Sequence, residues 1–294
     1  MKRKLLLLLF LLIGSLATSA QMEYRLARSN GQLKLNINGA VVEGYEGKEI
    51  IFSNRNATNE QVDDRAKGLV AVSTSGYLDN TGLGFNIVAN GQDISVNHVL
   101  SNSSDILKIK VPNGMKLSIS CNSNQFYQDF VIRNFKGEIE VAANYNKIIS
   151  ENNTGPMNVS TINGAVEATF DREIKGPISL VSIYNYVDVA LPPATKANIE
   201  MITFYGKLYA ARELQIVPDQ VAVNKISDPA EGDRDGSTKQ KGNAKSLTRS
   251  LSIGGAVGFG DQAIRAEKIK GKLNGGGIDL IIRSNNRNVY LRNK

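Results

Sequence analysis

The sequence predicts an all-β protein whose main part is a β-solenoid with rows of about 20 residues. Three observations lead to this prediction. Residues 115–212 contain an internal repeat, each repeat alternates apolar and polar residues with period two, and each has an Asn or Gly turn at a fixed position. A β-sandwich or a meander of antiparallel strands would give a similar period, so it stays open as the alternative.

The repeat consists of five rows, which start at Met115, Gly137, Gly155, Gly176 and Ala197, with spacings of 22, 18, 21 and 21 residues. The apolar residues two and four positions after each start are Leu117, Ile139, Met157, Ile178 and Ile199, then Ile119, Val141, Val159, Leu180 and Met201. The smaller residues six positions after each start are Cys121, Ala143, Thr161, Ser182 and Thr203. Because one row cannot bury its apolar face alone, we expect the rows to stack in register around a continuous core.

A turn and a second apolar column follow in every row. The turn column holds Asn124, Asn146, Gly164, Asn185 and Gly206, and the apolar column holds Phe126, Ile148, Val166, Val187 and Leu208. Asn and Gly suit the corners of such rows because both tolerate left-handed backbone conformations. Each row is therefore predicted to be two short strands joined by a tight corner.

The N-terminus has the three parts of a secretory signal peptide. Met1-Lys2-Arg3-Lys4 is basic, residues 5–13 are apolar, and Thr18-Ser19-Ala20 supplies small residues ahead of Gln21. The apolar run is shorter than the ~20 residues of a membrane span. We therefore expect an exported protein located in the periplasm, at the outer membrane or on the cell surface, with no transmembrane segment.

The remaining chain divides by pattern. The expected parts are the signal peptide (1–20), an N-terminal β region or cap (21–104), the solenoid repeats (105–224), a polar insertion or flexible loop (225–250) and C-terminal solenoid rows (251–294). In the N-terminal part, residues 33–37 alternate ahead of the turn signal Asn38-Gly39. The closing segment, with Asn285 and Asn286 at its turn, is similar to one more row.

Four segments carry a resemblance to a known family. They are Val111-Pro112-Asn113-Gly114, FKGEIEVAANYNKIISENNTGPMNVSTINGAVEATF (135–170), VDVALPP (187–193) and KGKLNGGGIDLIIRSNNRNVYLRNK (270–294). Together they resemble the putative-adhesin family of bacterial exported proteins, a domain of unknown function. The resemblance covers about 106–212 and 270–294. It implies a right-handed β-helix-like fold and an adhesin-like role, and it supplies no catalytic motif.

The composition restricts the possible chemistry. Cys121 is the only cysteine and His98 the only histidine, which argues against a zinc site built from Cys and His and against a Ser-His-Asp site within the repeat. Cys121 continues the inward column and is expected to be a buried filler. No catalytic, metal-binding or cofactor-binding residues are assigned. Residues 225–294 carry a net charge of +7, but export makes nucleic acid the least favoured partner.

Two sets of outward residues are candidates for a site. Glu167 and Asp188 share a column on neighbouring rows, but no basic residue is expected beside them, so a solvated face is favoured over Ca²⁺ binding or acid–base chemistry. Tyr145, Tyr184 and Tyr205 lie eight residues after their row starts, with Asn163 between the first two. We expect Tyr184 and Tyr205 one rung apart. A line of rings is either a platform for sugars or a stack that fastens the rows.

The functional prediction is a non-enzymatic, exported cell-envelope protein, an adhesin-like or scaffold β-solenoid with a candidate glycan platform. Two alternatives stay open. One is a carbohydrate-active enzyme on a β-helix, which requires a cleft with three or more acidic or basic groups; the sequence predicts none. The other is a periplasmic accessory protein that binds a protein partner. The expected partners are thus a polysaccharide or an envelope protein, and no cofactor is expected.

The first testable prediction concerns processing. We expect export to remove residues 1–20, so that the mature chain starts at Gln21. N-terminal sequencing or intact-mass measurement of the exported protein checks this. A chain that retains Met1 in the envelope fraction would contradict the prediction.

Overall fold

The computed structural model describes residues 23–54, 64–99, 106–219 and 266–294. The predicted signal peptide (1–20) and polar insertion (225–250) lie outside these residues. Regular structure in the described residues is β, apart from one 3₁₀ turn, η1 (Asp64–Ala66). Within the same residues, no helical segment is long and apolar enough to cross a membrane.

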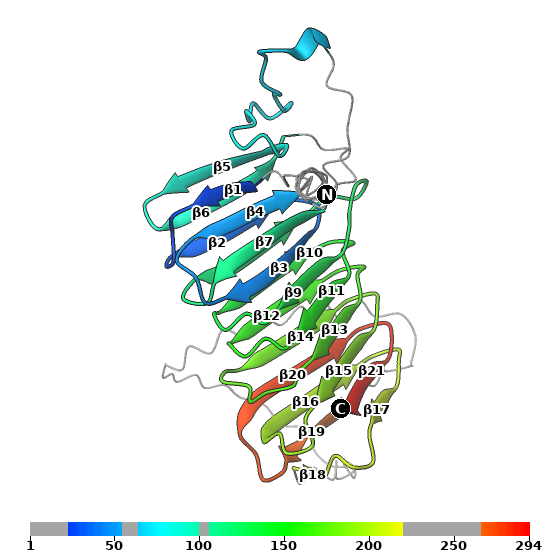
Figure 1. Cartoon of the computed structure of the whole chain (residues 1–294). Helices are drawn as coiled ribbons and strands as arrows, with labels where there is room; N and C mark the ends of the chain where they lie inside the picture. Colours follow the sequence, from blue (N-terminus) through cyan, green and yellow to red (C-terminus); the bar gives the residue numbers. More distant parts are fainter. Residues whose placement is uncertain (1–22, 55–63, 100–105, 220–265) are drawn as a thin grey trace, which may run out of the picture. The chain divides into compact units, whose positions relative to one another are not determined.

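The described strands form two sheets (Figure 1). In order across sheet A, the ten strands are β1 (Glu23–Leu26), β4 (Ile50–Asn54), β7 (Leu107–Pro112), β3 (Ala40–Tyr45), β9 (Phe130–Arg133), β11 (Ile148–Glu151), β13 (Val166–Thr169), β15 (Val187–Leu191), β21 (Val289–Asn293) and β17 (Leu208–Ala210). In order across sheet B, the eleven strands are β18 (Ile216–Pro218), β19 (Glu267–Leu273), β16 (Ala197–Thr203), β20 (Ile278–Ser284), β14 (Ile178–Ser182), β12 (Met157–Thr161), β10 (Ile139–Ala143), β8 (Lys116–Cys121), β2 (Gln32–Asn36), β6 (Asp93–His98) and β5 (Phe85–Asn90).

The fold is therefore all-β, with two large mixed sheets. From β8 to β17 the chain alternates between a strand of sheet B and a strand of sheet A. We call a strand of sheet B, together with the strand of sheet A that follows it in the sequence, a row; β2/β3, β6/β7 and β20/β21 are also rows. Neighbouring rows are hydrogen-bonded in parallel in both sheets, and both sheets have the same row order: β6/β7, β2/β3, β8/β9, β10/β11, β12/β13, β14/β15, β20/β21 and β16/β17.

The predicted register of the first four rows is confirmed in sheet B. Leu117 pairs with Ile139, Ile139 with Met157, and Met157 with Ile178. These side chains are buried and belong to the same hydrophobic cluster as the buried residues of sheet A. Period-two alternation places every second side chain of a strand on one face, which is why the pattern predicts the core correctly.

The second apolar column is right in its middle rows and wrong at Phe126. Ile148, Val166 and Val187 are aligned and fully buried, but Phe126 is 49% exposed. Phe130 takes its place, pairs with Ile148 and is fully buried. The first row is the longest, at 22 residues, and its extra residues lie in the corner, so a fixed offset from the row start no longer finds the inward residue.

The order of the rows differs from the sequence order at both ends. The closing row β20/β21 is last in the sequence, but in both sheets it lies between β14/β15 and β16/β17. In the same way, β2/β3 lies between β6/β7 and β8/β9. The Asn38-Gly39 turn therefore joins strands of different sheets. The row pattern alone could not predict this order because all rows present similar faces to their neighbours.

Antiparallel strands flank the parallel rows. At one end, β5 pairs with β6 and β4 pairs with both β1 and β7; at the other, β19 pairs with both β16 and β18. The expected N-terminal cap thus holds two kinds of strand. β1, β4 and β5 lie at the ends of the sheets, whereas β2, β3 and β6 are strands of the rows themselves.

A buried hydroxyl fixes the corner between the two strands in four successive rows, β12/β13, β14/β15, β20/β21 and β16/β17. The four hydroxyl residues, all fully buried, are Thr161, Ser182, Ser284 and Thr203. Each accepts a hydrogen bond from the backbone N–H three residues later, at Gly164 (3.2 Å), Asn185 (3.0 Å), Arg287 (3.0 Å) and Gly206 (3.1 Å). Each also donates to a corner carbonyl of the preceding row, at Asn146 (3.3 Å), Gly164 (2.7 Å), Asn185 (2.7 Å) and Arg287 (2.9 Å). We call this chain the hydroxyl ladder.

Asn and Gly occupy the corners for a different reason from the one expected. Among described non-glycine residues, the left-handed conformation occurs at Asn134, Asn152 and Asn274, which are outside the predicted turn column. A Cβ on Gly164 would lie 1.8 Å from the Asn146 carbonyl oxygen, so only glycine fits where two rows approach this closely. The amide of Asn146 donates to two backbone carbonyls, those of Asn38 and Gln128, both at 2.7 Å.

The ladder leads to a stability prediction. Ser182→Ala removes one hydroxyl and leaves the Gly164 carbonyl and the Asn185 N–H without this buried partner. We expect the free energy of unfolding to fall by ~1–3 kcal/mol, measured by urea denaturation.

Ser179→Ala, on the outward face of the same strand, is the matched control and should change stability by less than about 0.5 kcal/mol. Equal effects of the two substitutions would show that the ladder does not stabilise the corners.

Candidate functional site

An open hollow lies at the corners of four successive rows. The residues that line it are Asn163, Tyr184, Asn286, Arg287 and Tyr205. In each row, the Asn or Tyr follows the buried hydroxyl of the ladder by two residues. The hydrophobic core and the hollow are therefore coupled: the inward hydroxyl fixes the corner, and the corner presents the outward side chain.

Backbone hydrogen bonds between rows hold the lining residues in place. The N–H of Tyr184 donates to Ile162 at 2.7 Å, that of Asn286 to Ile183 at 3.0 Å, and that of Tyr205 to Asn285 at 3.0 Å. Consequently the lining residues are fixed one above another at the spacing of hydrogen-bonded strands, about 4.8 Å per row.

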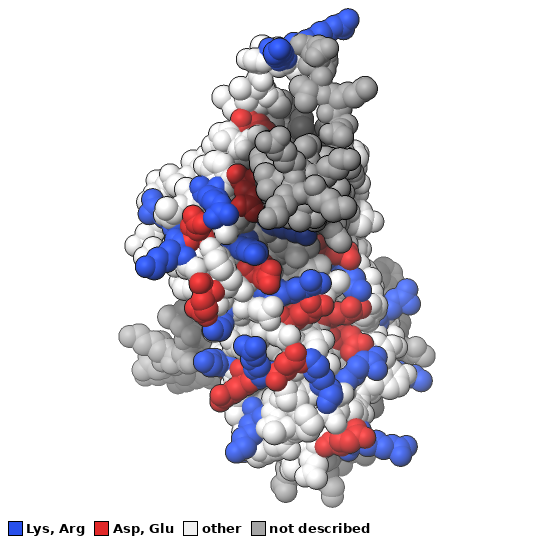
Figure 2. Space-filling view, viewed as in Figure 1, with Lys and Arg blue, Asp and Glu red and all other residues white. Residues whose placement is uncertain are grey.

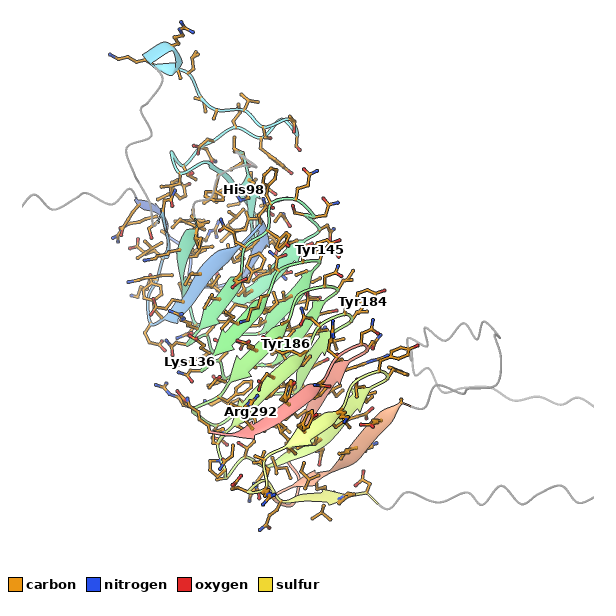
Figure 3. All side chains as sticks on the ribbon, turned by 90° about the vertical axis from the view of Figure 1, so that its right-hand side faces the viewer. His98, Lys136, Tyr145, Tyr184, Tyr186 and Arg292 are labelled. Carbon is orange, nitrogen blue, oxygen red and sulfur yellow. The ribbon has the colours of Figure 1, made fainter. Side chains whose placement is uncertain are left out.

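The tyrosines occupy alternate rows. In row order this corner position holds Tyr145, Asn163, Tyr184, Asn286 and Tyr205. The expectation that Tyr184 and Tyr205 lie one rung apart is wrong, because the closing row lies between them. Their Cα positions are two rows apart, roughly 10 Å. Tyr145 and Tyr184 lie along the same margin of the rows in Figure 3.

The structure gathers Tyr184 and Tyr205 into the hollow but not Tyr145. Tyr184 and Tyr205 are 54% and 65% exposed. The ring of Tyr145 instead stacks on Tyr127, with centroids 5.4 Å apart and planes at 26°. Among the described aromatic residues, no ring contact joins Tyr184 to Tyr205. Ring-on-ring fastening thus describes Tyr145, whereas the faces of the other two rings are open.

Sequence reasoning missed Asn286 and Arg287 as lining residues. The sequence does contain a signal for them, because it places Asn285 and Asn286 at the turn of a further row. What the pattern did not contain was the position of that row between those of Tyr184 and Tyr205.

A second polar cluster involves the predicted carboxylate column. Glu167 and Asp188 are paired neighbours, as expected. The expectation that no basic residue lies beside them is wrong: Lys147 Nζ is 2.9 Å from Glu167 Oε1, and Arg292 Nε is 2.7 Å from Asp188 Oδ1. Arg292 comes from the inserted closing row. Figure 2 shows that positive and negative side chains are interspersed over the face in view.

A tyrosine hydroxyl completes this cluster. Tyr186 donates a hydrogen bond of 2.6 Å to Glu167 Oε1, and this bond, together with burial, raises the pKa of Tyr186 to about 12. Burial also raises the pKa of Glu167, but the hydrogen bonds from Tyr186 and Lys147 outweigh it and lower that pKa below its usual value. Both carboxylates are thus neutralised by protein groups.

Beside this cluster lies a groove whose lining side chains contact one another. Its lining includes Tyr209, Tyr290 and Arg292. The ring of Tyr209 stacks on that of Tyr290, at 5.3 Å and 10°, and the Arg292 guanidinium lies 5.3 Å from the Tyr290 ring centroid. Stacked rings here fasten neighbouring rows to each other.

A cleft with several charged groups lies among loops that follow sheet A strands. Its lining includes Asp171, Arg172, Glu173 and Lys196, although the sequence had predicted no cleft of this kind. Asp171 is ion-paired with Lys294, and Arg172 and Glu173 are exposed.

The other residues considered in the sequence, Cys121 and His98, make packing contacts within the fold. Cys121 is buried, as predicted, and burial raises the pKa of its thiol. His98 packs against Phe85 with ring centroids 4.8 Å apart. Across the described ranges, no three His, Cys, Asp or Glu side chains gather into a group that could hold a metal ion.

Comparisons with known proteins give two structures of low similarity. No protein-family model and no curated protein matches the chain. A crystal structure described as a putative cell adhesion protein from Clostridium sporogenes has 13% identity and a TM-score of 0.41, and covers 93% of this chain and 100% of its own. One described as a putative adhesin from Bacteroides fragilis has 9% identity and a TM-score of 0.37, and covers 94% and 98%. Both TM-scores are below 0.5, so neither fold nor function is inferred from these proteins.

The Tyr186–Glu167 bond leads to a pH prediction. Since the folded-state pKa of Tyr186 is about 12 and the ordinary value is 10.0, this group stabilises the fold below pH 10, and its contribution is lost as the pH rises from 10 through 12. We expect Glu167→Gln to lower the pKa of Tyr186 towards 10, measured as phenolate absorbance in an alkaline titration against Tyr186→Phe. An unchanged titration in Glu167→Gln would contradict the prediction.

Proposed function

We propose that this chain is a non-enzymatic, exported β-solenoid of the cell envelope that binds glycans at the corner hollow, in an adhesin-like or scaffold role. Export rests on the three-part N-terminal segment. Glycan binding rests on one observation: two exposed tyrosines, two asparagines and an arginine line a single open hollow on rigid corners.

The solenoid arrangement is supported by the path of the chain. From β8 to β17, strands of sheets B and A alternate along the sequence, each row pairs in parallel with its neighbour, and one hydrophobic cluster runs through the rows. A parallel sheet needs a connection that returns the chain to its starting side, and here the strand in the opposite sheet provides it. A meander of antiparallel strands would reverse direction between neighbours instead.

The residue types of the hollow suit sugars. The faces of tyrosine rings pack against the apolar faces of sugar rings. Amide groups of Asn163 and Asn286 both donate and accept hydrogen bonds, which matches sugar hydroxyls. The separation of Tyr184 and Tyr205 by two rows, roughly 10 Å, gives room for an extended oligosaccharide rather than a single sugar.

The cleft beside Asp171 and Glu173 is the observation that favours the alternative, a carbohydrate-active enzyme. Glycoside hydrolysis requires two carboxyl groups in complementary roles. Asp171 forms an ion pair with Lys294. The exposed Glu173 therefore has no unpaired carboxylate beside it among the residues that line the cleft. Hydrolysis of oligosaccharides by the wild type, abolished in Glu173→Gln, would favour the enzyme over a binding role.

Binding can be tested by single substitutions in the hollow. We expect the mature chain to bind members of a broad glycan array. Tyr184→Ala and Tyr205→Ala should each weaken binding by about fivefold to tenfold, measured by calorimetry with an array-selected oligosaccharide, because each removes one ring face. Their melting temperatures should stay close to that of the wild type, since both rings are more than half exposed.

Tyr77→Ala, which removes a partly exposed ring elsewhere, is the control and should bind normally. Absence of any glycan binding by the folded wild type would end this proposal. Loss of stability without loss of affinity per folded molecule would assign the two rings to the fold instead.

A further inference from the structure

We propose that the hollow selects acidic glycans, and that Arg287 binds their carboxylate or sulfate groups. This inference rests on the proposed glycan binding and adds the chemical class of the ligand. It follows from three features of Arg287: its fixed backbone, a side chain that forms no ion pair with any described residue, and its position between the rows of the two tyrosines.

The backbone of Arg287 is held on both sides by the hydroxyl ladder. Its N–H donates to Ser284 Oγ at 3.0 Å, and its carbonyl accepts from Thr203 Oγ1 at 2.9 Å. A Cβ on Gly206 would lie 2.2 Å from the same carbonyl oxygen, so the backbone of the neighbouring row packs closely against it. A fixed Cα pre-organises the side chain and reduces the entropy lost when a ligand binds.

The guanidinium of Arg287 has no ion-pair partner among the described residues, and the side chain is exposed. Other arginines on the same rows are engaged. Arg292 forms three hydrogen bonds with Asp188, and the Arg283 guanidinium lies 5.3 Å from the ring centroid of Phe204. The hollow therefore presents a cation that none of the described residues neutralises.

Among the described residues, the lining of the hollow contains no carboxylate to repel an anion. Besides Arg287 it consists of two asparagines, Asn163 and Asn286, and two tyrosines, Tyr184 and Tyr205. A guanidinium offers two parallel N–H donors that match a carboxylate or sulfate, and bonds to a charged acceptor are stronger than those between neutral groups. A neutral sugar would leave this donor pair without a charged partner.

The order of the rows gives the charged and aromatic residues of the hollow different positions along a bound glycan. The closing row places Arg287 between the rows of Tyr184 and Tyr205. A glycan that packs on both rings therefore passes the guanidinium between them, and an acidic group on an internal sugar meets it there. The amides of Asn163 and Asn286 remain for sugar hydroxyls.

The test uses probes that differ only in charge. Tetragalacturonate and its fully methyl-esterified form have the same sugar rings, and a sulfated galactan tetrasaccharide separates sulfate from carboxylate. These join an array in which acidic glycans are paired with neutral counterparts. We expect the wild type to bind acidic members about tenfold or more tightly than their neutral partners, with affinity falling as salt rises.

Arg287→Gln should weaken the binding of acidic members much more than that of their neutral partners and so remove the preference, whereas Tyr184→Ala should weaken both to a similar extent. Arg212→Gln, which removes one exposed charge outside both the hollow and the charged cleft, is the control and should keep the preference. Equal binding of acidic and neutral partners by the wild type, or a preference that survives in Arg287→Gln, would overturn the acidic selectivity while glycan binding stands. No binding to any array member would overturn both proposals.

Discussion

The structure depends on how each corner is tied to the corner before it. A corner turns the chain between two sheets, so its backbone N–H and C=O groups leave the strand pattern while they are still buried, and buried groups without partners are costly. The ladder of Thr161, Ser182, Ser284 and Thr203 satisfies one N–H of its own row and one carbonyl of the preceding row at each step. This column holds only small residues, with Cys121 and Ala143 in the two rows before the four hydroxyls, because a larger side chain would displace the neighbouring row. Ser and Thr at this position therefore both fit the limited space and supply the hydrogen bonds that the corner needs.

The closing row extends the same interaction to chain segments that are distant in sequence. Ser284 bonds to Asn185, and Arg287 accepts the bond from Thr203, so the ladder runs through the inserted row without interruption. This row has a hydrogen-bonded neighbour on each side in both sheets. This row comes last in the sequence but lies between two earlier rows, so pairing between distant segments must form before the candidate site is complete. Asn286 and Arg287 enter the hollow through this insertion, and Arg292 joins the charge cluster in the same way.

The sequence predicts what each row contains better than which rows are neighbours. Period two identifies Leu117, Ile139 and Val166 as inward residues because the pleat leaves no other choice. The same regularity hides the row order, since Tyr184 would be equally well placed beside Tyr205 or beside Asn286. Of the three predicted tyrosines, the two that share the hollow were found from their column. Arg287 was missed because its role comes from the insertion, and the ion pairs of Lys147 and Arg292 were missed because they join different rows.

A consequence for specificity follows from this separation of inward and outward positions. The outward residue two positions after each ladder hydroxyl is Asn, Tyr, Asn and Tyr in successive rows of the hollow, while the hydroxyl itself stays Ser or Thr. Substitution of the outward side chain leaves the backbone bonds of the corner intact, because those bonds use main-chain atoms. The rows therefore act as a rigid array in which aromatic, amide and charged groups can be exchanged at a constant spacing of about 4.8 Å. The corner can stay rigid while its outward side chain varies, because main-chain atoms form the hydrogen bonds and side-chain atoms form the surface.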